Sequence, residues 1–539
     1  MAGRHTFQQQ STTMKQAILV ILALSAGHLC QAQTWNENFE NQPANVRYGS
    51  SNPTRIAYNA VRNFAVANVD YSNTRGDFHA IDASGRAHTI GAYVGGLRRL
   101  GKIDVQGHLS YQNRQDNDQS WNSTLWLLPD NPFILCDSVV GDATTEQFDM
   151  RAAAAYQVAD RWNIALELGL RTGSRADQTD PRPRSVTSML PVTVGADYRL
   201  TDSWNVGLAT GVQFYNQIIE YTKGGTLTGV SHRYFVMKGM GDYVKRASGD
   251  EPGYKRDYKG TSYHVALSAC WQPADGHLAN FIEASLSSNN QNATDGGTYY
   301  SFKAGDYTET VASLQERLSW HPASHTLHHF IVAASFGSGK GTWFDQKREL
   351  DLEHGGLVFY RELNKSAIHK SQRLTASLKY QLDLLRNDGR RNLSVTASAA
   401  LNSMTRKHFL GETTPKQETQ TLNLQLQAEK MIYINKVSLL AQVGGGYQMP
   451  QKQHYASGTV YSGEDNIDAA YTRRLFEYET AKCWNVGALV DASLPVSQKL
   501  TAGAYAGLNY RAYSGKNEYW QGYDGTHLTA IQAGLYVKF

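Results

Sequence analysis

The sequence is poor in cysteine, with four among 539 residues. Cys136, Cys270 and Cys483 follow the N-terminal segment, and they are far apart in the chain. A sparse, odd-numbered set argues against a framework of disulfides, although a single bridge between two of them stays open as an alternative. The fold must therefore be held together by other means.

The sequence also has little net charge, +4 at neutral pH. Its lysines and arginines are spread along the chain and form no basic stripe. Proteins that bind nucleic acid carry concentrated positive charge, because they must neutralise phosphates. We therefore expect no nucleic-acid partner.

Long hydrophobic runs are missing after the N-terminal segment, where no stretch reaches 18 consecutive apolar residues. This excludes transmembrane helices from that part of the chain. Glycine and tyrosine are abundant instead, with 47 and 31 residues, whereas proline is scarce at 13. That composition favours many strands over helices.

The N-terminal segment itself has the pattern of an export signal. Lys15 precedes the apolar run "AILVILALSAG", which is too short to span a bilayer as a helix. Cys30 and Ala32 stand at the −3 and −1 positions of a cleavage site. We therefore predict a signal peptide over residues 1–32, and a mature chain that begins at Gln33.

Two alternatives concern this segment. Met14 is an alternative start of translation, and Cys30 is a weaker candidate for lipidation because the bulky Leu29 precedes it. Residues 33–57 are expected to form a periplasmic N-terminal arm. An arm of that length is much shorter than the plug domain of a TonB-dependent receptor, which argues against that class.

Stretches of alternating polarity recur through the rest of the chain. Examples are "WNIALELGLR" at 162–171 and "TLNLQLQAEK" at 421–430, in which every second residue is apolar. Such alternation is typical of strands with one polar and one apolar face. Each stretch has about the ten residues that a tilted strand needs to cross a bilayer.

The connections between these stretches alternate between short turns and long polar segments. The long ones are 117–143, 222–256, 341–368 and 450–479. This rhythm is typical of an outer-membrane barrel with short periplasmic turns and long extracellular loops. We therefore predict an all-β fold, a closed antiparallel transmembrane β-barrel over residues 58–539. Eighteen strands are expected, and sixteen is the alternative if the weak segments 88–100 and 308–322 are not strands.

Tryptophans recur beside the short turns, at Trp162, Trp204, Trp271 and Trp320. An indole ring suits the boundary between water and lipid, because its body is apolar and its N–H can stay hydrated. Aromatic residues also flank turns in soluble sheets. Four at the same end of the strands favour an aromatic girdle.

The chain ends in "GLYVKF", an alternating strand that continues to its final aromatic residue. This end, together with an arm containing "NP", resembles Bacteroidetes-type outer-membrane barrels, and in particular a barrel family of unknown function. The resemblance implies that Leu535, Tyr536 and Phe539 form an assembly signal read by the barrel-insertion machinery. It implies an outer-membrane location in contact with lipid, and it implies no activity.

Strand parity predicts which charged side chains face the lumen. Both signs occur in similar numbers, which fits either a poorly selective pore or an inner wall of ion pairs. The predicted lumen-lining residues are Asp149, Arg151, Glu167, Arg171, Asp197, Arg199, Glu283, Arg373, Lys379, Glu429, Asp491 and Arg511.

Signals of catalysis or cofactor binding are weak. The histidines between His321 and His329 are a minor candidate for a metal site, since alternation sends His328 and His329 to opposite faces. The segment "FGSGKGTW" lacks the spacing of a phosphate loop and is expected to be a flexible loop at a strand end. We find no nucleophile motif, so we expect no enzyme and no cofactor.

Three functions are weighed. A passive channel for small polar solutes is narrowly favoured, because sixteen to eighteen strands can leave an aqueous lumen. The main alternative is a non-conducting accessory barrel that partners a transporter or a surface lipoprotein. Its support is the loop "YFVMKGMGDYVKRASGDEPGYKRDYKG", whose aromatic and basic residues suggest a contact surface. A barrel enzyme is the third and least favoured.

Overall fold

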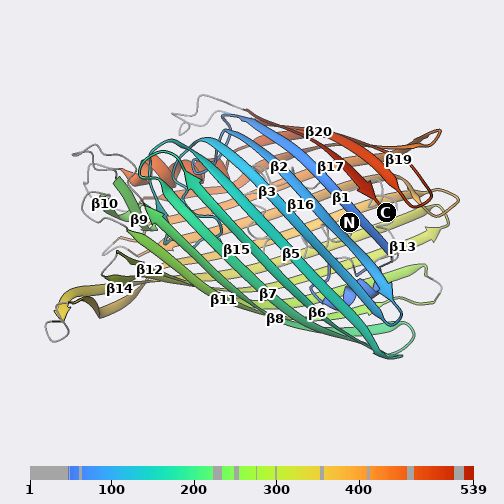
Figure 1. Ribbon diagram of the computed structural model, residues 1–539, viewed down its shortest axis with the longest axis horizontal. Coiled ribbons are helices and arrows are strands. Elements are labelled where there is room, and N and C mark those ends of the chain that lie inside the picture. Colours follow the sequence, from blue (N-terminus) through green and yellow to red (C-terminus); the bar gives the residue numbers. More distant parts are fainter. Residues whose placement is uncertain are drawn as a thin grey trace.

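The computed structural model shows a barrel whose wall is one antiparallel sheet (Figure 1). It describes residues 46–47, 49–59, 63–221, 233–247, 254–274, 276–297, 300–351, 357–409, 413–457, 466–514 and 527–539. The wall strands are β1 (Asn63–Gly76), β2 (Arg86–Leu100), β3 (Ile103–Gln119), β5 (Gly141–Ala159), β6 (Trp162–Asp177), β7 (Pro183–Arg199), β8 (Trp204–Tyr221), β11 (Lys255–Trp271), β12 (Leu278–Gly296), β13 (Ser301–Ala323), β14 (Thr326–Asp351), β15 (Leu357–Leu385), β16 (Arg391–His408), β17 (Lys416–Ile434), β18 (Val437–Ala456), β19 (Cys483–Pro495), β20 (Thr501–Tyr513) and β21 (His527–Lys538).

Each wall strand pairs with the next wall strand along the chain, and the last pairs with the first. Val69 of β1 lies opposite Leu535 of β21, and the backbones of Ala65 and Phe539 exchange two hydrogen bonds of 2.9 and 3.2 Å. The sheet is thus closed and has eighteen strands, as the alternation predicted; the alternative of sixteen is wrong. Closure leaves no unpaired edge, which is what a hydrocarbon environment requires.

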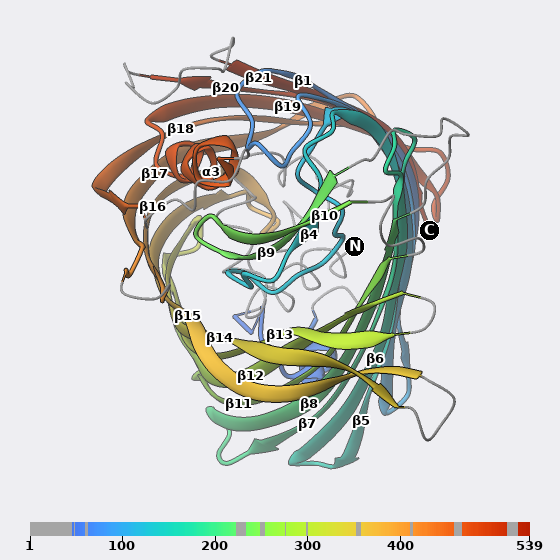
Figure 2. The same cartoon turned by 90° about the vertical axis from the view of Figure 1, so that its left-hand side faces the viewer.

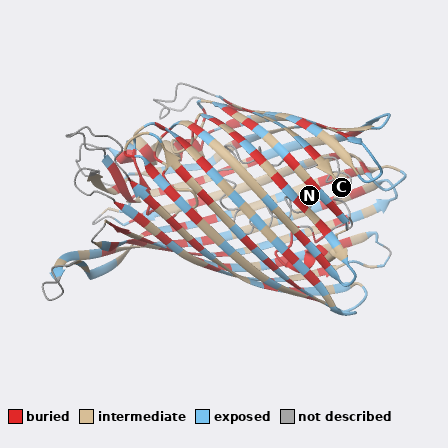
Figure 3. Ribbon diagram, in the orientation of Figure 1, coloured by how far each residue is buried: buried red, intermediate tan, exposed pale blue. Residues whose placement is uncertain are grey.

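Buried and exposed residues alternate along the wall strands (Figure 3), and the two faces differ in polarity. On β6, Leu166, Leu168 and Leu170 are exposed on the outside, while Glu167 between them is buried inside. Leu424 and Leu426 of β17 are likewise exposed on the outer face. An exposed apolar outer surface with a polar interior is the pattern of a barrel surrounded by lipid. Among the described residues, no helix is long and apolar enough to span a membrane.

One predicted loop is instead a long hairpin. Segment 341–368 was expected to be a polar loop, but β14 continues to Asp351 and β15 begins at Leu357. Beyond Thr342, β14 pairs only with β15, so the two strands project past the rim of the barrel (Figure 1). The glycine-rich "FGSGKGTW", expected to be a flexible loop, lies within β14. Apolar residues such as Leu350, Phe359 and Leu363 occur in this ribbon, but charged residues between them interrupt the alternation by which a strand is recognised.

Other extracellular segments fold inward and fill the mouth of the barrel (Figure 2). A small sheet is built from β4 (Leu135–Cys136), β9 (Arg233–Gly239) and β10 (Asp242–Ala247). Beside it lie the one-turn π-helix η3 (Asp468–Thr472) and the helix α3 (Arg473–Glu479). We call these segments, together with 120–140, the cap.

Candidate functional site

The N-terminal arm lies inside the barrel, near the end that carries the short turns. Its described part, residues 46–47 and 49–59, includes the 3-10 helix η2 (Pro53–Tyr58). Asn52 caps this helix by accepting the N–H of Thr54 at 3.0 Å, and Pro53 opens it. The described residues of the expected periplasmic arm are therefore in the lumen. The predicted signal peptide lies outside the described residues.

Charged residues of the arm pair with the inner wall. Arg47 binds Asp197 at 3.0 Å, and Arg55 binds Glu167 at 2.8 Å. Tyr58 also donates a hydrogen bond to Asp197. Burying a carboxylate is costly unless a cation or donors compensate it. These two wall carboxylates, predicted to line the lumen, are thus compensated by the arm.

Glu283 on β12 is satisfied by uncharged donors of the same arm. It accepts the hydroxyl of Ser50 at 2.6 Å and the backbone N–H of Ser51 at 2.9 Å. Gln315 of β13 donates to the same carboxylate at 3.2 Å and to the carbonyl of Gly49. The arm is therefore held across several wall strands at once.

Close approach of the arm to the wall depends on two glycines. The Asn52 amide donates to the carbonyls of Ala196 and Leu208, on β7 and β8, at 2.9 and 3.2 Å. A methyl group on Gly195 would lie 2.1 Å from Asn52 Oδ1, and one on Gly207 would lie 2.9 Å from its Nδ2. Only a residue without Cβ leaves room for this contact.

The remaining predicted lumen residues occupy three settings. Near the arm, Arg151 binds Glu167 at 3.2 Å, and Asp149 lies 3.9 Å from Arg171. Asp491 accepts the hydroxyl of Tyr536 at 2.8 Å. Half-buried inner positions at mid-wall are taken by Lys379 and Glu429.

Arg373 and Arg511 contact the cap, and Arg199 differs from the rest. Arg511 donates to Cys483 Sγ and, at 2.8 Å, to the hydroxyl of Tyr478 on α3. Arg199 shares the parity of Asp197, but it is exposed beside a short turn. A position at the end of a strand is solvated whichever way it points.

The cap has an apolar core of its own. Tyr234, Phe235, Val236 and Met237 of β9 are all nearly inaccessible to solvent, and Leu135 and Cys136 pack with them. The loop that contains β9 was expected to be a contact surface because of its aromatic and basic residues. That interpretation is wrong for β9, because its side chains are buried within the mouth. Burial also raises the pKa of the Cys136 thiol, which keeps it protonated.

A shared carboxylate ties the cap to the wall on one side. Asp130 accepts Arg373 of β15 at 3.1 Å and Arg406 of β16 at 2.8 Å. Arg406 also binds Glu479, at the end of α3, at 2.9 Å. Arginine suits such a position because its fork of donors reaches two carboxylates at once. One loop residue and one helix residue are thus joined through a single wall arginine.

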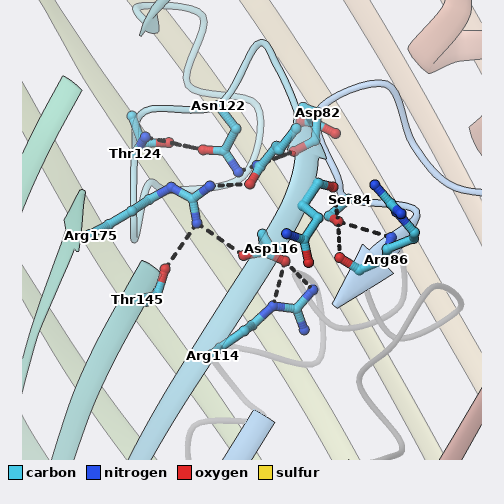
Figure 4. A network of polar contacts seen from close by, with 11 residues as sticks. Asp82, Ser84, Arg86, Arg114, Asp116, Asn122, Thr124, Thr145 and Arg175 are labelled. Atoms are coloured by element: carbon cyan, nitrogen blue, oxygen red, sulfur yellow. Dashed lines mark hydrogen bonds and ion pairs between the residues drawn. The ribbon is translucent and has the colours of Figure 1, made fainter. Parts of the chain in front are cut away.

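A second polar network ties the cap to the opposite side of the wall (Figure 4). Asp116 of β3 accepts Arg114 at 2.7 Å and Arg175 of β6 at 3.2 Å. Arg175 also donates to Gln119, whose amide donates to the backbone carbonyl of Asp82 at 2.9 Å. Asn122, in the cap, donates to the same carbonyl at 3.2 Å. Burial raises the pKa of the Asp82 side chain to about 6.

Between arm and cap lies a cavity of about 630 Å³. Ser51 of the arm, Tyr471 of the cap and inner residues of β5 to β12 line it. Polar side chains in its lining include Arg151, Arg171 and Gln213. The loop "LWLLP" at 125–129 contributes a run of apolar side chains to this lining. A space of this size, largely preformed and mixed in polarity, is typical of a site for a small organic molecule.

The predicted girdle and the histidine cluster lie near the short turns. Trp162, Trp204 and Trp320 are each close to half exposed, and the rings of Trp204 and Trp271 are 6.4 Å apart. His328 contacts Trp320 and Tyr380, whereas His329 faces inward toward Asp383 at 3.4 Å. Within the described ranges, no three histidine, cysteine or acidic side chains are placed to hold a metal.

The proposed assembly signal divides between the two faces of β21. Leu535 and Phe539 are exposed on the outer face, and Tyr536 is buried inside. Its reading by the insertion machinery stays a prediction.

Several residues of the site gave no signal in the sequence. Asn52, Trp126 and His369 were not singled out, because each acts through a partner that is distant in the chain. Trp126 lies over the guanidinium of Arg171, at 4.1 Å. The pair Asn-Pro at the start of η2 was noted only for its resemblance to other barrels. Its capping geometry was a signal that could have revealed an ordered arm.

Comparisons with solved structures find barrels of low similarity. The RagAB peptide transporter matches with 8% identity and a TM-score of 0.44, over 89% of this chain and 87% of that chain. The copper transporter OprC matches with 8% identity and a TM-score of 0.42, over 88% and 80%. A Pseudomonas aeruginosa FadL homologue matches with 10% identity and a TM-score of 0.33, over 95% and 98%. These likenesses concern the barrel fold alone.

Sequence comparison is more specific. No curated protein matches the chain. A family model does match, over residues 53–539, and it begins at the first residue of η2. The matched region includes Pro53, Arg55 and every strand of the wall. The chain thus belongs to DUF6850, a family of unknown function.

Proposed function

We propose that this protein is a gated transport channel of the outer membrane, exported by the signal at 1–32 and belonging to the Bacteroidetes-type barrels. The passive, open channel favoured by the sequence is modified in one respect. The lumen holds a docked arm at one end and a folded cap at the other. Solute passage then requires one of these inserts to move.

The observation that carries this proposal is the polar docking of the arm. Its polar contacts with the wall are ion pairs and hydrogen bonds to Asp197, Glu167 and Glu283, which water can replace when the arm leaves. Among its described residues, Val46 and Ile56 add buried apolar contacts with the wall. The cavity between the two inserts could hold a solute during its passage. The proposal assigns transport to the barrel and no catalysis.

Single-channel conductance in a planar lipid bilayer tests the proposal. The wild type should show low conductance with rare openings. The double variant Arg47→Ala/Arg55→Ala removes two cations from the arm and should give sustained openings. Arg161→Ala, at an exposed turn, is the matched control and should behave as the wild type. A large, steady wild-type conductance would show instead an open pore.

The second candidate is the non-conducting accessory barrel, partnered by an outer-membrane protein or lipoprotein. It is favoured by the same filling of the lumen, if neither insert ever leaves. The double variant separates the two functions. Continued silence in the bilayer, from a variant shown to be folded by its heat-dependent migration in gels, would support the accessory role.

A further inference from the structure

The cavity between arm and cap contains charges of both signs, and most of them are matched. Glu167 is bound by Arg55 and Arg151, within 3.2 Å of each. Asp130 is bound by Arg373 and Arg406, within 3.1 Å of each. These groups hold the arm and the cap, so their charges are compensated within the protein.

Arg171 is matched less well. It projects from β6 into the cavity and keeps 23% of its side-chain surface accessible. Its ion pair with Asp149 is long, at 3.9 Å, and it donates one hydrogen bond, to Gln147 at 3.2 Å. Asp149 is itself shared with His108, at 3.4 Å. A guanidinium has five N–H donors, so Arg171 can accept a further anionic partner.

Trp126 forms a fixed apolar platform beside this cation. The guanidinium carbon of Arg171 is 4.1 Å from the centre of the ring. The backbone of Trp126 is held from two sides, because its N–H donates to Gln217 at 3.1 Å and its carbonyl accepts the hydroxyl of Tyr215. Leu125, Leu127 and Leu128 continue the apolar surface along the cavity. A charged contact and an apolar surface are thus adjacent.

A second polar group lines the cavity on its cap side. His369 is 3% exposed, and neither of its ring nitrogens has a hydrogen-bond partner among the described residues. A buried polar group without a partner is costly unless a bound molecule or water satisfies it. This imidazole therefore marks a further point at which a bound molecule can form a hydrogen bond.

We propose that the cavity binds a small amphipathic organic acid. Its carboxylate would form a charge-assisted pair with Arg171, which favours the bidentate geometry of a planar anion. Its apolar body would lie along Trp126 and the neighbouring leucines. This inference rests on the proposed transport function for its biological meaning, since it names the class of solute that the barrel would carry.

Binding measurements on the full chain in lipid nanodiscs test the inference without requiring transport. The probes are a panel of small aromatic and aliphatic carboxylic acids, each paired with its uncharged primary amide, observed by saturation-transfer NMR and titrated. Acids should bind the wild type, and their amides should bind more weakly. Arg171→Gln should weaken acid binding at least about tenfold and leave the amides little changed.

Two further variants separate recognition from folding. Arg171→Lys keeps the positive charge and should retain the preference for acids over amides. Arg161→Gln makes the same kind of change at an exposed turn and should bind like the wild type. If Arg171→Gln does not fold, Trp126→Ala provides the second test, since it should weaken binding of acids and amides alike by removing the platform.

The inference is overturned if no acid of the panel binds the wild type, if amides bind as tightly as acids, or if Arg171→Gln keeps full affinity for the acids. None of these results depends on conductance. If the wild type binds acids but the Arg47→Ala/Arg55→Ala variant shows no conductance, the transport function is rejected and the binding site is retained. If the variant conducts but no acid binds, the binding site is rejected and the transport function is retained.

Discussion

The two inserts of the barrel are built differently, although both fill the same lumen. The arm has one short helix and is held to the wall by ion pairs and hydrogen bonds, with Val46 and Ile56 packed against apolar wall residues. The cap has its own sheet and a buried aromatic core, to which its polar networks are added. Polar contacts exchange readily with water, whereas an apolar core is lost only by unfolding. This difference is the reason for proposing that the arm, and not the cap, is the insert that moves.

The largest expected effect comes from breaking the cap at its shared carboxylate. Asp130→Ala leaves Arg373 and Arg406 facing each other in the buried mouth without the oxygen atoms that separate them. Removing one partner of a buried ion pair costs about 3–5 kcal/mol, and the loss should lie at the lower end of that range because Arg373 keeps Glu309 and Arg406 keeps Glu479. The cap should then become sensitive to protease within 120–140, while the wall stays intact.

Limited proteolysis in detergent, followed by mass spectrometry, measures this loss. Asp388→Ala is the control, because Asp388 lies in an exposed turn and its pair with Arg386 is worth under about 1 kcal/mol. Equal protection of the cap in Asp130→Ala and the wild type would show that the aromatic core alone holds it.

A smaller effect is expected when a substitution in the wall displaces the arm. Gly195→Ala places a methyl group 2.1 Å from Asn52 Oδ1 and 2.8 Å from Pro53, so the start of η2 must shift. Overpacking of this kind costs about 1–3 kcal/mol. Hydrogen exchange at the amides of Thr54 and Arg55 should accelerate, and exchange in β9 should not.

Gly337→Ala on β14 is the matched control, because its nearest neighbour would lie at an ordinary 3.4 Å. Protection of the Thr54 amide that is the same in Gly195→Ala and in Gly337→Ala would mean that the arm is not seated as described.

The smallest expected effect is a dependence of the stability of the cap on pH. Burial raises the pKa of Asp137, in the cap, from its ordinary 3.8 to about 7. The folded cap therefore holds a proton that the unfolded chain has released, so its stability is full below pH 4 and is lost as pH rises toward 7. Between pH 6 and pH 7 the loss should be about 1 kcal/mol.

Proteolysis of the cap across this pH range measures the effect, with Asp137→Asn as the comparison. The asparagine variant cannot titrate, so its cap should lose less stability over the same range. A cap whose protection rises with pH would contradict the sign of this linkage.

The wall was predictable from the sequence, whereas the contents of the lumen were not. Alternation in "TLNLQLQAEK" is a local signal, because each side chain meets either lipid or the interior according to its own parity. The partner of an inward charge has no such local rule. Arg47 and Asp197 are 150 residues apart, and nothing near either one identifies the other.

The cap was missed for a related physical reason. Its strands β9 and β10 have seven and six residues, too short to cross a bilayer, and they lie in a segment that reads as a loop. The strands in segment 341–368 were missed for another reason, because charged residues such as Lys347 and Arg361 interrupt the apolar alternation by which strands are recognised.

The position of the arm in the chain bears on the order in which the barrel assembles. Residue 59 follows η2 directly, and β1 begins four residues later, at the seam where β1 meets β21. A wall that closed first would have to be threaded by the arm from one end. If β1 and β21 pair last, the wall can instead form around an arm that already lies against β7 and β8. We expect the second route, in which the arm is a template for closure as well as the contents of the closed barrel.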